Sequence, residues 1–232
     1  MKKVAIFVEG QTEQLFMEKV IKEIMGMHGF SIKNYKFIGG KNYIRKALLL
    51  TTFKNNENID FFFIIYDCGG DESVKSDICE RIESLKYASF THVIGLRDVF
   101  PETDINKIKH YLYYGLPAIK DISTNIILAI NEIEAWFLAE ETHYPKISKK
   151  LNIQIVNETA SIDVSKDDTQ VIICPSDTLK QIYIKGGTTY DKSKEKVERT
   201  VNYLDYDNLY FSVRKRNNSL NELLTCLDGL IP

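Results

Sequence analysis

The sequence contains few cysteines and no cysteine pair. Its four cysteines, Cys68, Cys79, Cys174 and Cys226, lie far apart and form no CxxC motif. This spacing gives no support to a zinc knuckle or to a redox-active dithiol, and it fits the reducing environment of the cytoplasm. The four histidines are not spaced as metal ligands either.

Long apolar runs and the common catalytic motifs are also absent from the sequence. The apolar stretch after Met1-Lys2-Lys3 is too short for a signal peptide, and no run approaches the roughly 20 residues that cross a bilayer. We therefore expect a cytoplasmic protein that does not enter a membrane. A Walker loop, a GxGxxG motif, an HExxH motif and a Ser-His-Asp order are missing, so the corresponding enzyme classes have no support. The net charge of -2 excludes a globally basic nucleic-acid binder but permits a local basic surface.

What the sequence does contain is a series of apolar runs that end at acidic residues. With 44% hydrophobic residues in 232, the chain can form one large α/β domain, alone or with a smaller appendage. Continuous runs of this kind predict strands that are buried on both faces of a sheet. The runs and the acids that follow them are 4–8 with Glu9, 61–66 with Asp67, 92–96 with Asp98, and 126–130 with Glu132 and Glu134.

Segments with helical periodicity separate these runs. The spacing of apolar residues predicts helices over 12–25, 44–53 and 73–87 and a further helix that Asp104 caps, and residues 35–38 are a short additional strand. Strands that alternate with helices predict a mostly parallel sheet with right-handed crossovers, in which the carboxyl ends of the strands share one edge.

The acids that follow the strands should therefore converge. We expect Glu9, Asp67, Asp98 and at least one of Glu132 and Glu134 at this edge, because ligands bind there in open α/β sheets. Two carboxylates about 5 Å apart repel by roughly 3 kcal/mol at an effective dielectric near 20, so such a cluster needs a proton, a basic neighbour or a divalent cation. Oxygen ligands in this number suit Mg²⁺ or Mn²⁺.

The pair Glu132 and Glu134 leaves two geometries open. If residues 132–140 are helical, the two side chains point to nearly opposite sides and only one of them faces the edge. If the strand continues through residue 134, both face it. We favour Glu132, which is nearer the strand end, and Glu134 then lies behind it or on the surface. Trp136 and Phe137 are predicted to be core residues.

These residues resemble uncharacterised bacterial families related to the Toprim domain. The resemblance rests on Val8-Glu9-Gly10 with Thr12-Glu13, on the acids after later strands, and on Asn131-Glu132-Ile133-Glu134-Ala135-Trp136. It implies a Toprim-like, Rossmann-like domain over residues 1–142. Related families are often encoded beside ATPases and are linked to phage defence, and Toprim nucleases of the overcoming-lysogenization-defect type bind Mg²⁺.

The resemblance also implies roles for individual residues. Glu9 would act in acid/base or metal chemistry, and Asp67 or Asp98 would hold the metal. In Toprim domains an Asp-x-Asp pair does this. This chain lacks the second aspartate after both positions, which leaves Asp71 or the pair of Glu132 and Glu134 as substitutes.

The remainder, residues 143–232, is predicted to be a mainly helical subdomain. Residues 152–168 look like a polar, loop-rich segment, helices are expected to start at Pro175 and to end at Leu204, and Ser219 with Glu222 predicts a capping box for the last helix. Residues 180–216 contain nine Lys or Arg against five acids, interleaved with five tyrosines. This composition suits a strand of nucleic acid, and it suits equally a solvated helix pair with tyrosines in the core. Lys192 follows a glycine turn, so its ammonium could reach a phosphate at the edge of the sheet.

Three functions are compatible with these features. The first is a nuclease, a Mg²⁺- or Mn²⁺-dependent phosphodiester hydrolase in which Glu9, Asp67, Asp98 and Lys192 take part in catalysis. The second is a non-catalytic module that partners an ATPase, and the third is an enzyme of nucleotide phosphotransfer.

Overall fold

The computed structural model describes residues 1–40, 45–99, 104–117 and 120–231, apart from the side chains of residues 71 and 72. A six-stranded, mostly parallel sheet flanked by helices makes it an α/β protein, as the sequence predicts. The elements of the first part of the chain are β1 (Lys2–Val8), α1 (Gln11–Met25), β2 (Phe30–Ile38), β3 (Lys46–Lys54), β4 (Phe61–Asp67), α2 (Asp71–Tyr87), β5 (His92–Asp98), α3 (Ile105–Tyr113) and β6 (Ser123–Ala129).

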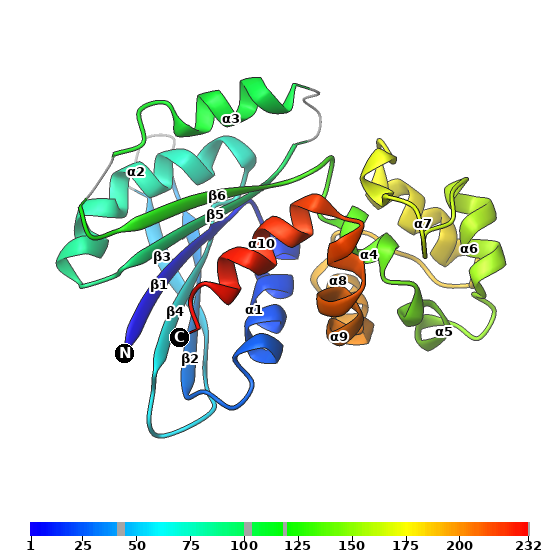
Figure 1. The fold of residues 1–232 in the computed structure, drawn as a ribbon, viewed down its shortest axis with the longest axis horizontal. Helices are drawn as coiled ribbons and strands as arrows, with labels where there is room; N and C mark the ends of the chain where they lie inside the picture. The colour runs from blue at the N-terminus through cyan, green and yellow to red at the C-terminus, as the bar shows by residue number, and fades with distance from the viewer. Residues whose placement is uncertain (41–44, 100–103, 118–119, 232) are drawn as a thin grey trace. The chain divides into compact units, whose positions relative to one another are not determined.

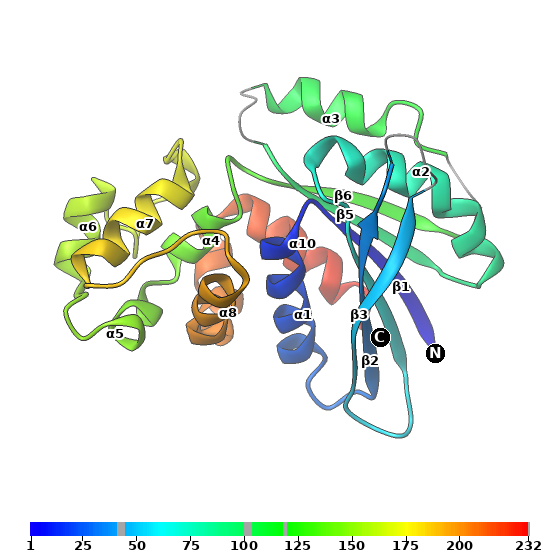
Figure 2. The ribbon, with the colours of Figure 1, turned by 180° about the vertical axis from the view of Figure 1, so that it is seen from behind.

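The sheet has the strand order β3-β2-β4-β1-β5-β6, with β1 inside it (Figure 1). Strands β2, β4, β1 and β5 run parallel to one another, and β3 runs antiparallel to β2. Helix α1 covers one face of the sheet, whereas α2 and α3 lie on the other face, as the two opposite views show (Figures 1 and 2).

Strand β1 is buried over most of its length. All of its residues from Val4 to Val8 are 0% exposed, because the strand has a neighbour on each side and helices above and below. Ala5 and Phe7 pack with residues of α2, and the alternation of side chains along a strand directs Ile6 to the opposite face. The continuous apolar run in the sequence is thus the signature of a central strand.

Residues 46–54 form strand β3, although the sequence predicts a helix over 44–53; residue 44 lies outside the described part of the chain. Gly39 and Gly40 have φ values of +87° and +124° at the end of β2, which glycine adopts without strain, and they begin the reversal into an antiparallel neighbour. Helical periodicity was a poor guide here because β3 is an edge strand with exposed side chains on both faces, so no buried stripe sets its period.

The chain divides into two compact units. The first comprises Met1–Arg97 and Asp104–Ile127, and the second comprises Asp98–Thr103 and Leu128–Pro232. The division falls within β6, earlier than the boundary predicted between residues 142 and 143. Its position follows from α4 (Glu134–Ala139), which is completely buried among the helices that come later in the chain.

The second unit is mainly helical. Its elements after α4 are a 3₁₀ turn η1 (Glu141–His143), α5 (Tyr144–Ile147), α6 (Ile153–Ala160), η2 (Thr169–Val171), α7 (Pro175–Lys185), α8 (Lys194–Tyr203), α9 (Tyr206–Phe211), η3 (Val213–Lys215) and α10 (Asn218–Asp228). No helix in the described part of the chain is long and apolar enough to cross a membrane.

Helix α4 is the centre of this unit. Trp136 and Phe137 are fully buried, as predicted. The indole Nε1 of Trp136 donates to Ser219 Oγ at 2.8 Å, and Thr169 Oγ1 donates to the carbonyl of Ala135 at 2.6 Å. Two elements from later parts of the sequence, η2 and α10, therefore fix the short helix in place.

Two local predictions for this region are wrong. Residues 152–168 are not all loop, because Asn152 caps the helix α6 by accepting a hydrogen bond from Ile155 N at 3.0 Å. The cap of α10 is Asn217, which accepts from Leu220 N at 3.1 Å, so Ser219 lies inside the helix. Both helices are capped by an asparagine, Asn152 in α6 and Asn217 in α10, which is a favoured residue at this position.

Candidate metal centre

Asp98 is the last residue of β5 and the first residue of the second unit. It is also one of the acids that the sequence predicts for the site. Next to it, Val99 N donates to the carbonyls of Ala129 and Asn131 at 2.9 and 3.1 Å, which joins the end of β5 to the end of β6. Asp98 is 4% exposed, and its Oδ1 accepts a hydrogen bond from Ile133 N at 2.9 Å. The carboxylate therefore sits against the segment that connects β6 to α4.

Asn131 gives this segment its shape. The residue has a φ of +60°, a left-handed conformation that asparagine tolerates better than most residues, and its Nδ2 donates to the carbonyls of Gln170 and Ile172, both at 2.8 Å. The turn places Glu132 just before α4, and Glu134 is the first residue of that helix.

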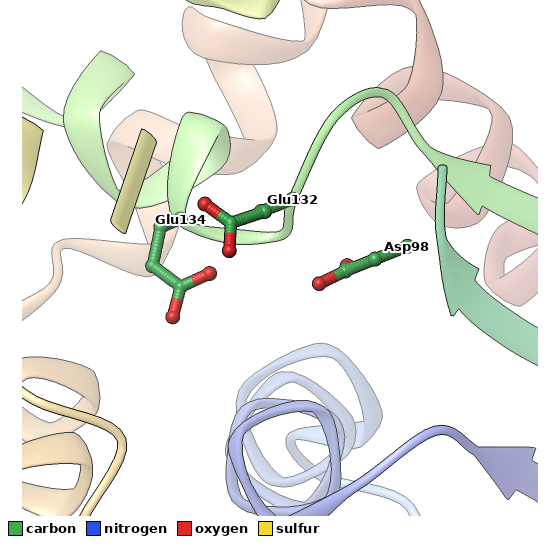
Figure 3. Close-up of side chains that lie close together, drawn as sticks. All are labelled: Asp98, Glu132 and Glu134. Carbon is green, nitrogen blue, oxygen red and sulfur yellow. The ribbon is translucent and has the colours of Figure 1, made fainter. Parts of the chain in front are cut away.

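The carboxylates of both glutamates lie close to that of Asp98 (Figure 3). The prediction that Glu134 lies behind Glu132 or on the surface is wrong, because Glu134 is 0% exposed and belongs to the same cluster. Neither of the two geometries considered for residues 132–134 is present. The segment is a tight turn that leads into a helix, so the two side chains are not related by helical or strand geometry.

A different hydrogen-bond donor holds each glutamate. Glu132 accepts from Ser176 at the start of α7, with Ser176 N at 2.8 Å from Oε2 and Ser176 Oγ at 2.9 Å from Oε1. Glu134 Oε1 accepts from the buried hydroxyl of Tyr190 at 2.8 Å. Sequence reasoning did not assign these two supporting residues. Ser176 could have been found from the sequence, because it lies at a predicted helix start, where backbone N–H groups are unpaired and can bind a carboxylate. No local pattern indicates Tyr190.

Lys192 brings a positive charge to the three carboxylates. Its Nζ lies 3.1 Å from Glu132 Oε1, 3.6 Å from Glu134 Oε2 and 3.9 Å from Asp98 Oδ2. Burial lowers the pKa of Lys192, but the negative charges of Glu134, Asp98 and Glu132 raise it by more, so the pKa lies above its usual range. The ammonium therefore stays charged.

Glu134 is the most deeply buried of the three acids, at 0% exposed. Burial raises the pKa of its carboxyl group and Glu132 adds to the rise, whereas Lys192 and Tyr190 oppose it, and the net direction is upward. Its Oε2 has no hydrogen-bond donor among the described residues. A buried carboxylate oxygen without a donor is costly, and it is the kind of atom that a bound cation would satisfy.

The three acids have the donor chemistry and spacing of a site for a hard divalent cation. Asp98, Glu132 and Glu134 each offer one carboxylate oxygen, and these oxygens lie within 4.8 Å of one another. Carboxylates are the ligands that Mg²⁺ and Mn²⁺ prefer, and the donor-free Oε2 of Glu134 is one of the atoms that point to the common centre.

Glu9 and Asp67 lie in the first unit, at the carboxyl ends of neighbouring strands. Asp67 ends β4 and is the register partner of Val8, and Glu9 follows Val8 directly. Asp67 is 2% exposed, its Oδ1 accepts from Gly69 N at 2.9 Å, and Lys36 Nζ lies 3.4 Å from its Oδ2. The alternating strands thus bring these two acids to adjacent strand ends, as predicted. Asp71 begins α2, and its side chain lies outside the described residues.

Two of the five tyrosines of residues 180–216 are buried and are therefore not available for base stacking. Tyr183 and Tyr190 are 0% and 1% exposed, and the hydroxyls of Tyr206 and Tyr210 are engaged with Val201 O and Asp228 Oδ1 at 2.9 and 2.8 Å. Tyr203, at 42%, is exposed. Several basic residues also bind within the unit: Lys196 to Asp191, Arg199 to Thr188 and Thr189, Arg214 to Asp228, and Arg216 to Ala139 and Glu141. The composition thus reflects, for Tyr183 and Tyr190, tyrosines in the core of the unit.

Comparison with known proteins supports the fold class and no activity. No family model matches the sequence, and no curated protein matches it. Among solved structures, a hypothetical protein from Pyrococcus horikoshii OT3 is similar, with a TM-score of 0.54 and 13% sequence identity over 98% of this chain and 100% of that one. At this identity the similarity shows that the two chains share a fold, and it says nothing about what either protein does.

Proposed function

We propose that the protein is a Mg²⁺- or Mn²⁺-dependent phosphodiester hydrolase whose metal is held by the second unit. The observation that carries the proposal is the convergence of Asp98, Glu132 and Glu134 on one point, with a charged Lys192 beside them. A buried cluster of three acids is a costly arrangement for a purely structural role, because the carboxylates lose much of their hydration.

In this proposal each residue of the site has a definite task. Asp98, Glu132 and Glu134 would hold the cation. A bound divalent cation polarises a phosphate oxygen and lowers the pKa of water, which is the chemistry that hydrolysis of a phosphodiester needs. Ser176 and Tyr190 keep the two glutamate carboxylates in their orientation, and burial of Glu134 excludes water from the inner side of the site.

We further propose that the sheet is of the Toprim type. Two features support this assignment: the mostly parallel, Rossmann-like sheet, and the position of Glu9 directly after the central strand β1. Glu9 would then take the acid/base or metal role that the Toprim resemblance implies for it. The chain departs from the Toprim pattern in its metal ligands, since Glu132 and Glu134 stand in for the second aspartate.

The test is a cleavage assay on single-stranded and double-stranded DNA and RNA with Mn²⁺, with the wild-type protein and Glu134→Gln. Glutamine keeps the size of the side chain and removes its charge, so we expect cleavage to fall by at least about 100-fold. Glu198→Gln on α8 is the matched control, because Glu198 pairs with Lys194 on the surface and should leave cleavage unchanged. Metal-dependent cleavage that is equal in the wild type and in Glu134→Gln would refute the proposed site.

A second candidate function is favoured by Lys192 itself. Because the ammonium already compensates part of the acidic charge, the cluster can exist without a metal, as it would in a non-catalytic module that partners an ATPase. Binding of Mn²⁺ distinguishes the two candidates: the hydrolase binds it at millimolar concentration or below, and the module does not.

A further inference from the structure

Lys192 occupies the point at which a cation would bind the three acids. We propose that Lys192 is a resident counter-ion which must leave the cluster before the metal enters, so that ammonium and metal exchange at one position. The inference rests on the proposed metal site and concerns its regulation: the exchange sets how much Mg²⁺ the protein needs before it becomes active.

Each acid directs one carboxylate oxygen at Lys192, and of these Glu132 Oε1 also accepts a hydrogen bond from Ser176 Oγ at 2.9 Å. Asp98 Oδ1 is held by Ile133 N and Glu134 Oε1 by Tyr190, whereas Asp98 Oδ2 and Glu134 Oε2 point at Lys192 Nζ. Glu132 contributes Oε1, at 3.1 Å from the same nitrogen. One oxygen from each acid therefore surrounds the ammonium, and the other oxygen of each is engaged by a fixed donor, since Ser176 N binds Glu132 Oε2.

The two cations exclude one another for reasons of space and charge. Mg²⁺ lies about 2.1 Å from its oxygen ligands, and the same three oxygens surround Nζ at 3.1 to 3.9 Å, so one centre serves both. A divalent ion and an ammonium inside one ring of carboxylates would also repel each other strongly, because the surroundings are dry.

Lys192 can leave without disturbing the core. Its side chain is 47% exposed even while the ammonium touches the acids, so the alkyl stem already lies towards solvent. The residue lies between α7 and α8, in a segment without regular secondary structure. A change of side-chain rotamer, which needs no movement of a helix, is sufficient to carry the ammonium into water.

The exchange has a measurable consequence for metal affinity. Any metal that binds the wild-type protein must first displace the ammonium, which reduces the apparent affinity. Removal of the ammonium should therefore strengthen metal binding. If Lys192 served only to stabilise the three acids, its removal would not be expected to improve the site. Replacement of Lys192 by arginine should have the opposite effect, because a guanidinium binds carboxylates through two parallel hydrogen bonds.

The experiment measures Mn²⁺ binding by isothermal titration calorimetry and by electron paramagnetic resonance, without any substrate. We expect Lys192→Met to bind Mn²⁺ at least about tenfold more tightly than the wild type, and Lys192→Arg to bind it several-fold more weakly. Lys194→Met removes the same charge two residues away, where Lys194 pairs with Glu198, and should bind like the wild type. The double variant Lys192→Met/Glu134→Gln should lose the gain, which locates the ion at the cluster.

A second measurement uses the wild-type protein and avoids the risk that Lys192→Met does not fold. Acetylation of Lys192 by a water-soluble active ester, followed by peptide mass spectrometry, should become several-fold faster when Mg²⁺ is added, because the ammonium then leaves the acids for solvent. Lys194 is the internal reference, and its acetylation rate should not change.

The outcomes separate this inference from the proposed function. If the wild type and Lys192→Met bind Mn²⁺ with equal affinity, or if Mg²⁺ leaves the acetylation of Lys192 unchanged, the exchange is overturned and the metal site stands. If neither protein binds Mn²⁺ at millimolar concentration, the metal site is overturned together with the exchange.

Discussion

The hydroxyl of Tyr190 donates a hydrogen bond to Glu134 Oε1 across 2.8 Å, between side chains that are 1% and 0% exposed. The two residues are 56 positions apart in the sequence. Because burial raises the pKa of the Glu134 carboxyl group and this hydrogen bond lowers it, Tyr190 is one of the groups that keep a carboxylate in a dry site.

Tyr190→Phe removes this hydrogen bond and keeps the ring in place. We expect the free energy of unfolding to fall by about 1–3 kcal/mol, because Glu134 Oε1 loses its donor in a place that water does not reach. Chemical denaturation in guanidinium chloride measures the change. Tyr203→Phe is the matched control, since Tyr203 is 42% exposed. If both variants lose the same stability, the hydroxyl of Tyr190 does not support Glu134.

Stability should fall in acid because of a second buried carboxyl group, that of Glu140. Burial alone would raise its pKa, but hydrogen bonds and charge from His143, with hydrogen bonds from Thr142 and Asn208, lower it to about 2 from an ordinary value of 4.5. A depressed pKa in the folded state contributes stability above pH 4.5, and the contribution is lost as the pH falls towards 2. The shift corresponds to about 3 kcal/mol at most.

Denaturation curves between pH 7 and pH 2.5 test this expectation. The unfolding free energy of Glu140→Gln should depend less on pH below 4.5 than that of the wild type, because the variant has no proton to gain at this position. Glu158→Gln, at an exposed position on α6, should keep the wild-type slope. A wild-type slope in Glu140→Gln would show that other carboxyl groups cause the acid sensitivity.

Gly29→Ala should be strongly destabilising. A Cβ at this position would lie 1.7 Å from the carbonyl oxygen of Asn58, which is backbone and cannot rotate away. Gly29 also binds Asp60 and Phe61 at the start of β4 through its carbonyl, at 2.7 and 3.0 Å, so a shift of its backbone would disturb that strand. We expect a loss of at least about 2 kcal/mol in the unfolding free energy.

Gly229→Ala is the control for the same substitution. The nearest atoms to a Cβ there are the carbonyl oxygens of Cys226 and Thr225, both at an ordinary 3.6 Å, and the φ of -64° suits any residue. The unfolding free energy of Gly229→Ala should change by less than about 1 kcal/mol, and we expect a small increase because alanine restricts the unfolded chain. Similar losses in both variants would contradict the close approach at Gly29.

Glu9→Gln tests the role that the Toprim resemblance gives to Glu9. If the protein cleaves nucleic acid with Mn²⁺, the variant should cleave at least about 100-fold more slowly, because an amide cannot exchange a proton or carry the negative charge. Glu23→Gln on α1 is the control, since Glu23 forms an exposed ion pair with Lys19 at 2.9 Å. Equal cleavage by wild type and Glu9→Gln would remove Glu9 from the mechanism and leave the cluster of Asp98, Glu132 and Glu134 untouched.

The strands with continuous apolar runs could be predicted from the sequence because burial on both faces leaves a plain signal. Residues 4–8 and 61–66 belong to β1 and β4, and Asp98 ends β5 as expected. Edge strand β3 gave a misleading signal, since its pairing depends on β2 and on the turn between them, and its own side chains are mostly exposed. The pattern of residues 46–54 alone cannot show that they pair with a strand elsewhere in the sequence.

The cluster of Asp98, Glu132 and Glu134 was predicted only in part for the same reason. Asp98 and Glu132 could be found because each follows a strand, and Lys192 because it follows a glycine turn. The burial of Glu134 could not be found, because it depends on the left-handed turn at Asn131 and on Tyr190 from a distant loop. The sequence shows which groups are available, whereas the tertiary contacts decide which of them lose their water.

The residues of this cluster and their partners are translated at different times. Residues of the second unit come from two separate stretches, and the partner lysine of Glu132 follows it by 60 positions. On the ribosome the acids therefore emerge long before the serine, tyrosine and lysine that hold them, and until then they must remain hydrated. The nascent polypeptide can close this part of the molecule only late in translation, so the last third of the chain controls when the three carboxylates first come together with their partners.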